Sequence, residues 1–310
     1  MTKKVAVVFP GQGSQTVGML TELYQEFAVV RDTFASASAA LGYDLWQLIA
    51  NGPEEALNET HRTQPALLTA SVAVWRVWQQ QGGVTPAFMA GHSLGEYSAL
   101  VCAGVLSLEQ AVTLVEKRGT YMQSAVPAGT GAMSAIIGLD DELIAKACQE
   151  AAQGEVVSPV NYNSPGQVVI AGNKAAVERA NELCKAAGAK RALPLPVSVP
   201  SHCALMKPAA EHLAADLAAL QFNTPTIAVV NNVDVAVTAD ALAIKDALVR
   251  QLYSPVRWTE SIEWLVAQGV TDIVELGAGK VLSGLIKRIH RETNTSSVND
   301  VASLQAALIV

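Results

Sequence analysis

The stretch Met89-Ala90-Gly91-His92-Ser93-Leu94-Gly95-Glu96 decides the fold of this chain. It places one serine between two glycines, after the apolar run 86–90, which is typical of a buried strand, and before 96–104, whose pattern predicts a buried helix. A G-x-S-x-G sequence in this setting is a nucleophile elbow, a sharp turn that exposes the serine hydroxyl. Side chains in place of the two glycines would collide with the neighbouring strand and helix. A glycine-rich turn with an incidental serine is the alternative, and the flanking elements favour the elbow.

Composition limits the class of protein. The chain has 310 residues, half of them apolar, and a net charge of −7. The negative charge argues against a nucleic-acid or membrane-surface binder, and no apolar run approaches the ~20 residues of a membrane-spanning helix. The amino terminus begins like a signal peptide, but its apolar part (5–9) is shorter than the ~7–15 residues that such a signal needs. We therefore expect residues 4–9 to form the first strand.

The cysteines and histidines are scattered along the chain. No C-x-x-C pair and no H-E-x-x-H sequence occurs, so neither a disulfide scaffold nor a zinc site is expected. We predict a protein that works reduced in the cytoplasm, with no metal and no cofactor. The cysteines are Cys102, Cys148, Cys184 and Cys203.

Hydrophobic periodicity predicts a small domain inserted into a large one. From about 131 to 198 the expected elements are a strand at 132–139, a helix at 141–152, strands at 156–161 and 167–171 joined by a turn at 163–166, a helix at 174–187 and a strand at 189–197. This βαββαβ order is that of a ferredoxin-like unit. We expect an α/β fold in which a large α/β-hydrolase-like domain (1–127 and 199–310) has a parallel central sheet, and the small ferredoxin-like domain spans 128–198.

The rest of the large domain is predicted more coarsely. Helical patterns fill the chain to about residue 80, and a helix at about 108–124 starts with a capping box of Ser107 and Gln110. After the insertion we expect a helix to about 220, a strand near 227–231, a helix containing Gln251 and a strand at 272–276. The last ~20 residues are polar and then weakly helical, which is typical of a surface segment.

A serine hydroxyl needs a base to take its proton. His202 directly follows the inserted domain, so it lies at a domain boundary, where ligand sites are common. A surface or core histidine is the alternative, but we predict that His202 is the base. The side chain of His92 is expected to point away from Ser93, and no acid stands out as an orienting partner, so a carbonyl or amide oxygen is expected to hold His202. Polar, helix-patterned segments contain the remaining histidines, His61, His212 and His290.

The loop after the first strand contains a glycine-flanked glutamine, Gln12. It is not a dinucleotide-binding fingerprint, because Thr16 stands where the third glycine of G-x-G-x-x-G would be. A backbone donor at the end of a first strand is better used beside the elbow. We expect the N–H groups of Leu94 and Gln12 to form an oxyanion hole. A simple tight turn is the alternative reading and is compatible with this role.

These residues together resemble a known family. The segments Phe9–Gln15, Gly91–Glu96 and Val199–His202, with Arg118 and Gln251, closely resemble the malonyl-CoA:acyl carrier protein transacylases of dissociated fatty acid synthesis. The resemblance runs from about residue 5 to about residue 288. It implies an acyltransferase that moves malonyl from malonyl-CoA to the phosphopantetheine thiol of acyl carrier protein through a malonyl-serine intermediate.

The resemblance also implies roles for single residues. Ser93 would be the acylated nucleophile, and His202 would be its base, held by Gln251. Arg118 would bind the malonyl carboxylate, which its planar fork matches; from the residues alone, a solvated helix arginine is the alternative. The oxyanion hole would be Gln12 and Leu94, and the substrate-binding residues would be Arg118, Gln12, Asn163 and His92.

The expected partners are acyl carrier protein and malonyl-CoA, and the chain is expected to be a monomer. Acyl carrier proteins are acidic and so is this chain, so docking requires a local basic patch. A solvated charged surface is the alternative for each candidate. The candidates are Lys185, Lys190 and Arg191 in the small domain, and Lys287, Arg288 and Arg291 near the end of the chain.

A serine hydrolase and a non-enzymatic scaffold are the two alternative functions. A serine hydrolase of the patatin type would use an Asp-Gly dipeptide, which this chain lacks, and an α/β-hydrolase would usually carry its histidine nearer the end of the chain. A non-enzymatic scaffold that docks carrier proteins would not need the nucleophile, base and arginine together. The sequence does not set the tolerance for acetyl or methylmalonyl groups, or the choice between a fatty acid and a polyketide carrier.

Overall fold

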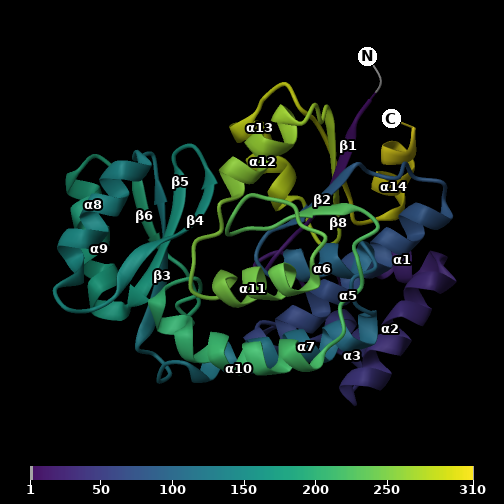
Figure 1. The fold of residues 1–310 in the computed structure, drawn as a ribbon, viewed down its shortest axis with the longest axis horizontal. Coiled ribbons are helices and arrows are strands. Elements are labelled where there is room, and N and C mark those ends of the chain that lie inside the picture. Colours follow the sequence, from purple (N-terminus) through teal and green to yellow (C-terminus); the bar gives the residue numbers. More distant parts are fainter. Residues whose placement is uncertain (1–2, 310) are drawn as a thin grey trace.

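The computed structural model describes residues 3–309 and is built on two sheets (Figure 1). The larger sheet is parallel, in the order β7-β2-β1-β8-β9. Phe9 pairs with Gly91, so the loops after β1 and β2 leave the sheet side by side at its carboxyl edge, where α/β proteins bind ligands. The strands are β1 (Val5–Phe9), β2 (Phe88–Gly91), β7 (Ala228–Val230), β8 (Asp272–Leu276) and β9 (Asn294–Val298).

Alternate side chains of β1 enter two different cores. Val7 and Phe9 pack into a large core, and Ala6 and Val8 face a smaller one on the opposite side of the sheet. The smaller core is covered by α12 (Trp258–Ala267) and α13 (Val281–Ile289). The helices that contribute to the large core are α1 (Thr21–Glu26), α2 (Ala28–Leu41), α3 (Leu45–Asn51), α4 (Glu54–Leu57), α5 (Thr60–Gln80), α6 (Gly95–Cys102), α7 (Leu108–Ser124), α10 (Lys207–Ala219), α11 (Ala241–Gln251) and α14 (Val301–Leu308), and the 3-10 helix η1 (Ala204–Met206) precedes α10.

The second sheet is antiparallel, in the order β4-β5-β3-β6, and it lies to one side of the main sheet with α8 and α9 (Figure 1). The chain order and sheet order are those of a ferredoxin-like unit, so the predicted fold class is confirmed. Domain boundaries at 127/128 and 198/199 remain a prediction. The elements are β3 (Gly131–Ile137), α8 (Asp141–Ala152), β4 (Val157–Ser164), β5 (Gln167–Asn173), α9 (Lys174–Ala186) and β6 (Arg191–Pro194).

The structure differs from the sequence predictions in three places. β4 runs to Ser164, into the expected turn, and β6 ends at Pro194, since prolines at 194 and 196 have no N–H for the ladder. At the carboxyl end the predicted helix is present as α14 and most residues lie at the surface, but the polar stretch 294–298 forms edge strand β9 beside β8, which was not predicted, and Val298 and Leu304 are buried. An edge strand with one open side needs few apolar residues, so β9 shows no alternation of apolar and polar residues from which a strand could be predicted.

The predicted capping box is confirmed: Ser107 and Gln110 bond each other's backbone at the start of α7. Within residues 3–309, none of the helices has the length and apolar character needed to cross a membrane.

Candidate active site

The elbow forms where the sequence predicts it, between β2 and α6. Ser93 has a left-handed backbone (φ = 53°), which a non-glycine residue adopts only at a cost. A Cβ on Gly91 would lie 1.9 Å from the backbone of Gly95, and a Cβ on Gly95 would lie 2.2 Å from the carbonyl oxygen of Phe9. The two glycines therefore allow the turn to press against both the starting helix and the neighbouring strand.

His202 meets the serine from the far end of the inserted domain. Its Nε2 lies 2.7 Å from Ser93 Oγ, and its Nδ1 lies 2.7 Å from the backbone oxygen of Gln251. A carbonyl oxygen only accepts hydrogen bonds, so Nδ1 carries the proton and Nε2 is free to accept from the serine hydroxyl. The geometry fixes the tautomer that a general base needs.

The imidazole of His202 is held neutral. Burial, together with the positive charge of Arg118, lowers the pKa of His202 to about 3, against the opposing effect of the bond to Gln251. At neutral pH this side chain is therefore an unprotonated acceptor.

The loop after β1 lies directly against the elbow. A Cβ on Gly11 would be 2.4 Å from the carbonyl oxygen of His92, so Gln12 follows at a point of close backbone contact. Among the described residues, the backbone N–H groups of Leu94 and Gln12 donate to no protein acceptor, whereas that of Ser93 donates to Asn232 Oδ1. Both N–H groups are therefore unpaired among the described residues, and their role as an oxyanion hole remains a prediction.

Arg118 is buried beneath the elbow, with 1% of its surface exposed. Its Nη1 donates to Gln64 Oε1 at 2.8 Å and its Nη2 to Gln251 Oε1 at 3.0 Å, while its Nε has no partner among the described residues. The guanidinium also lies 5.3 Å from the ring centroid of Tyr97. Burial lowers the pKa of Arg118. The alternative of a solvated helix arginine is wrong.

Arg118 has no carboxylate within ion-pair distance among the described residues. Its direct partners are amide oxygens, which carry only partial charge. A buried guanidinium with neutral partners and an unpartnered N–H favours a carboxylate as ligand.

A polar network that the sequence analysis missed lies under the elbow. The side-chain amide of Gln251 donates towards Glu96 Oε2 (2.6 Å), the carbonyl oxygen of Ser93 (3.1 Å) and Asn232 Oδ1 (3.2 Å). Asn232 also donates to the carbonyl oxygen of Gly91, and its own N–H donates to Glu96 Oε1. The one sequence signal for these residues is that Asn232 follows a strand at the ligand-binding edge of the sheet.

The remaining predicted substrate residues pair with each other. His92 Nε2 lies 2.7 Å from Asn163 Oδ1 at the end of β4, so the elbow is joined to the small sheet. Burial lowers the pKa of His92, and its ring lies against Trp258, with 5.5 Å between centroids. His92 thus bonds Asn163, as expected of a side chain that does not serve Ser93.

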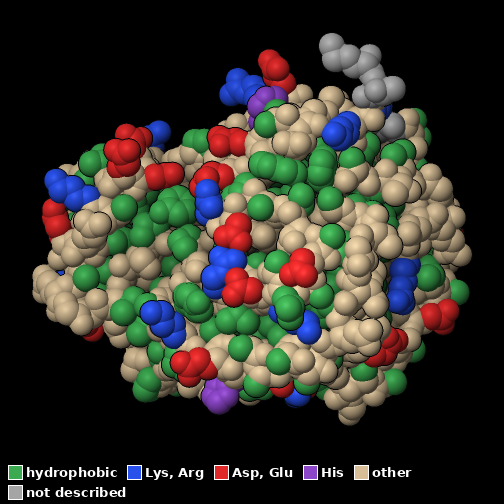
Figure 2. All heavy atoms as spheres, in the orientation of Figure 1, with side chains coloured by type: hydrophobic (Ala, Val, Ile, Leu, Met, Phe, Trp, Pro, Cys, Tyr) green, Lys and Arg blue, Asp and Glu red, His purple; other side chains and the backbone are tan. Residues whose placement is uncertain are grey.

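The predicted docking residues lie at two separate places. Lys190 and Arg191 are exposed at the start of β6 in the small sheet, and the stem of Lys190 covers Gly138. Lys287, in the last turn of α13, donates to the carbonyl oxygen of Thr293 and lines a cavity with Val5 and other residues from the amino ends of the main strands. On the face drawn in Figure 2, basic and acidic side chains are interspersed.

Comparisons with known proteins identify the family of this chain. The chain matches the model of the acyl transferase domain over residues 6–307. It is 69% identical over 303 residues to the malonyl CoA-acyl carrier protein transacylase of Salmonella typhimurium, covering 98% of both chains. It is 70% identical, with a TM-score of 0.96, to the structure of an acyl carrier protein S-malonyltransferase from Vibrio cholerae, covering 98% of this chain and 99% of that one.

A further solved structure contains a carrier protein. It is a malonyl-transacylase in complex with its type II polyketide acyl-carrier protein, with 64% identity, a TM-score of 0.98 and 99% of both chains covered. The family model spans nearly the whole chain, and the relatives match it from end to end. This chain therefore belongs to the acyl transferase domain family and, within it, to the malonyl-CoA:acyl carrier protein transacylases.

Proposed function

We propose that this enzyme transfers malonyl from malonyl-CoA to the phosphopantetheine thiol of acyl carrier protein in fatty acid biosynthesis. The observation that carries the proposal is the 2.7 Å contact between Ser93 Oγ and His202 Nε2. The turn that holds Ser93 also has backbone N–H groups without a hydrogen-bond partner among the described residues, and Arg118 is buried beneath it. Nucleophile, base, anion-stabilising donors and a carboxylate-binding cation are the parts that malonyl transfer requires.

The first half-reaction acylates the serine. Ser93 Oγ attacks the thioester carbonyl of malonyl-CoA while its proton passes to His202 Nε2. The backbone N–H groups of Leu94 and Gln12 stabilise the oxyanion of the tetrahedral intermediate. When the C–S bond breaks, His202 returns the proton to the sulfur, and coenzyme A leaves as the thiol.

The second half-reaction repeats these steps with a different thiol. His202 takes the proton of the phosphopantetheine thiol, whose sulfur attacks the malonyl ester of Ser93. The ester C–O bond breaks, the serine regains its proton from His202, and malonyl leaves on the carrier protein. Gln251 positions the imidazole through its backbone oxygen, which accepts a hydrogen bond from the Nδ1–H group and stabilises the transient imidazolium.

Arg118 selects malonyl over acetyl. A malonyl carboxylate supplies the charged partner that the buried guanidinium lacks, whereas acetyl leaves it paired only with the oxygens of Gln64 and Gln251. An unpaired buried charge costs ~2–5 kcal/mol, and that cost falls on the acetyl complex. Because the charge of Arg118 also lowers the pKa of His202, a carboxylate bound to Arg118 makes the base stronger.

The carrier protein docks through basic residues of the small domain, Lys190 and Arg191, with Lys287 and Arg288 as a second candidate patch. The enzyme works as a monomer in the cytoplasm, where its four free cysteines suit a reducing environment. Charge reversal of Lys190 and Arg191 together raises the Michaelis constant for acyl carrier protein and leaves that for malonyl-CoA unchanged. An unchanged constant for the carrier, with a rise on reversal of Lys287 and Arg288, moves the docking surface to the second patch.

A direct assay separates this function from its rivals. The protein is incubated with malonyl-CoA and holo acyl carrier protein, and malonyl-carrier protein, free malonate and coenzyme A are measured. A transacylase yields malonyl-carrier protein in step with coenzyme A. Malonate as the main product would indicate a hydrolase, and no turnover would indicate a scaffold.

A further inference from the structure

Glu96 is a fully buried carboxylate that none of the proposed chemical steps uses. It lies in the first turn of α6, three residues after the nucleophile, with 2% of its surface exposed. Its Oε1 accepts the backbone N–H of Asn232 at 3.0 Å, and its Oε2 accepts Gln251 Nε2 at 2.6 Å. Each oxygen thus holds one residue that touches the catalytic centre.

The orientation of the Gln251 amide follows from these contacts. Arginine only donates hydrogen bonds, so the atom that faces Arg118 Nη2 at 3.0 Å must be the amide oxygen. The amide nitrogen then faces Glu96, and its 2.6 Å contact is the shortest that Gln251 makes. Glu96, Gln251 and Arg118 form a chain in which a carboxylate and a guanidinium oppose each other across one amide.

The other oxygen of Glu96, Oε1, acts on the loop that carries the nucleophile. The N–H of Asn232 is fixed by Glu96, and the side chain of Asn232 spans the elbow, accepting from the N–H of Ser93 and donating to the carbonyl oxygen of Gly91. One carboxylate therefore anchors both the turn that carries the serine and the amide that faces the arginine.

We infer that Glu96 is a positioning residue: its carboxylate orients the Gln251 amide so that Arg118 is held ready for the malonyl carboxylate, and this sets the preference for malonyl over acetyl. The inference rests on the proposed function. Burial raises the pKa of Glu96 to about 8, against the opposing effects of Asn232, the charge of Arg118 and Gln251. Burial thus favours the protonated acid near neutral pH, whereas the two N–H donors that face its oxygens favour the carboxylate, so the assays are run above pH 8, where the carboxylate predominates.

The test is the isosteric variant Glu96→Gln, assayed with malonyl-CoA and acetyl-CoA. A glutamine presents an N–H group to either Asn232 or Gln251, so one of the two contacts becomes a repulsive pair of donors. We expect the ratio of kcat/KM for malonyl-CoA to that for acetyl-CoA to fall about tenfold, as for the loss of one hydrogen bond to a charged group. Glu96→Asp, which withdraws the carboxylate by one methylene, also lowers the ratio.

Glu275 provides the matched control. It is likewise buried, and its hydrogen-bond partners among the described residues are Leu282 and Ser283 at the start of α13, not Gln251, Asn232 or Arg118. Glu275→Gln lowers the melting temperature and leaves the malonyl/acetyl ratio unchanged. A wild-type ratio in either folded Glu96 variant, or an equal fall in Glu275→Gln, overturns the inference. Absence of a malonyl adduct on the wild-type protein would instead remove the proposed function.

Discussion

Ser93 and His202 share a 2.7 Å hydrogen bond and the same unusual backbone, with φ = 53° and φ = 63° respectively. Left-handed angles at non-glycine residues persist only where the surroundings enforce them. At Ser93 the tight contacts of Gly91 and Gly95 do so, and at His202 the backbone N–H donates to the carbonyl oxygen of Leu252. The two reacting side chains therefore meet because both backbones are constrained before substrate arrives.

The elbow glycines are expected to be irreplaceable. In Gly91→Ala the new methyl would lie 1.9 Å from the backbone of Gly95, so the turn must open and Ser93 must move away from His202. We expect malonyl transfer to fall by about 100-fold or more, since misplacement of reacting groups by ~1 Å has that effect. Gly284→Ala is the control, because a Cβ there meets nothing within 4 Å. Wild-type kcat in Gly91→Ala would contradict this account.

The low pKa of His202 predicts a pH-dependent stability. The folded protein binds fewer protons at this site than the unfolded chain between about pH 6.5 and about pH 3, so the free energy of unfolding falls as the pH is lowered through that range. In His202→Gln, which does not titrate, this part of the fall is absent. Urea unfolding at a series of pH values measures the difference, and parallel curves for the two proteins would show that burial of His202 has no such effect.

Arg118→Ala is expected to abolish selection for malonyl. Loss of the guanidinium removes the carboxylate partner and lowers kcat/KM for malonyl-CoA by about 100-fold or more, as for truncation of a buried charge pair. The value of kcat/KM for acetyl-CoA falls much less, because an acetyl group has no carboxylate to pair with Arg118. Lys117→Ala, a neighbouring exposed residue whose partner is Asp216, controls for changes in α7. An equal loss for both substrates would show that Arg118 supports the fold and does not select the acyl group.

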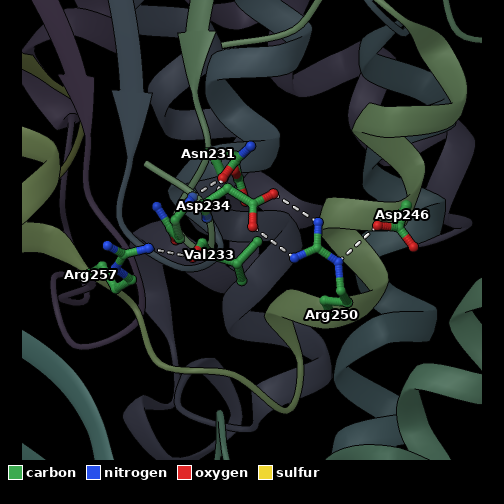
Figure 3. Close-up of polar contacts among 8 residues, drawn as sticks. Asn231, Val233, Asp234, Asp246, Arg250 and Arg257 are labelled. Carbon is green, nitrogen blue, oxygen red and sulfur yellow. Dashed lines mark hydrogen bonds and ion pairs between the residues drawn. The ribbon is translucent and has the colours of Figure 1, made fainter. Parts of the chain in front are cut away.

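An exposed ion pair is expected to affect activity through the loop that carries Asn232. Arg250, next to Gln251, binds both oxygens of Asp234 at 2.8 Å, and Arg257 donates to the carbonyl oxygen of Val233, so the loop is fastened on two sides (Figure 3). Arg250→Ala removes one of these two attachments and leaves that of Arg257. We expect a loss of ~0.2–1 kcal/mol of stability, the usual value for an exposed pair, together with a several-fold fall in kcat.

Arg179→Ala is the matched control for that variant. Arg179 pairs with Glu155 in the small domain at 2.7 Å, and its side chain is 31% exposed, close to the 34% of Arg250. Thermal melting and steady-state kinetics of both variants separate the two effects. Both lose a similar amount of stability, and only Arg250→Ala loses activity. Equal activities would show that the loop does not depend on the ion pair.

Most of the fold was predictable from local sequence patterns. The elbow, the βαββαβ order and the capping box at Ser107 are local, since each depends on residues close in sequence. The polar edge strand at 294–298 has no such pattern, because its pairing with β8 comes from the sheet and not from its own residues. The strand was missed for that reason.

Some residues of the site were likewise predictable from local sequence patterns, and others were not. Ser93 was predictable from its motif, His202 from its place after the insertion and Gln12 from its position after the first strand, whereas the roles of Arg118 and Gln251 came from the family resemblance. The contacts of Asn232 and Glu96 join segments more than 130 residues apart, and no spacing in the sequence encodes them. The polar network became visible only when the fold brought these segments together.

Intact mass spectrometry after incubation with malonyl-CoA tests the central claim most directly. Wild-type protein is predicted to gain one malonyl group, and peptide mapping places it on Ser93. Ser93→Ala gains none, and His202→Ala gains it far more slowly because the hydroxyl has lost its base. A wild-type protein that stays unmodified, or a Ser93→Ala variant that is modified as fast as the wild type, would contradict the account.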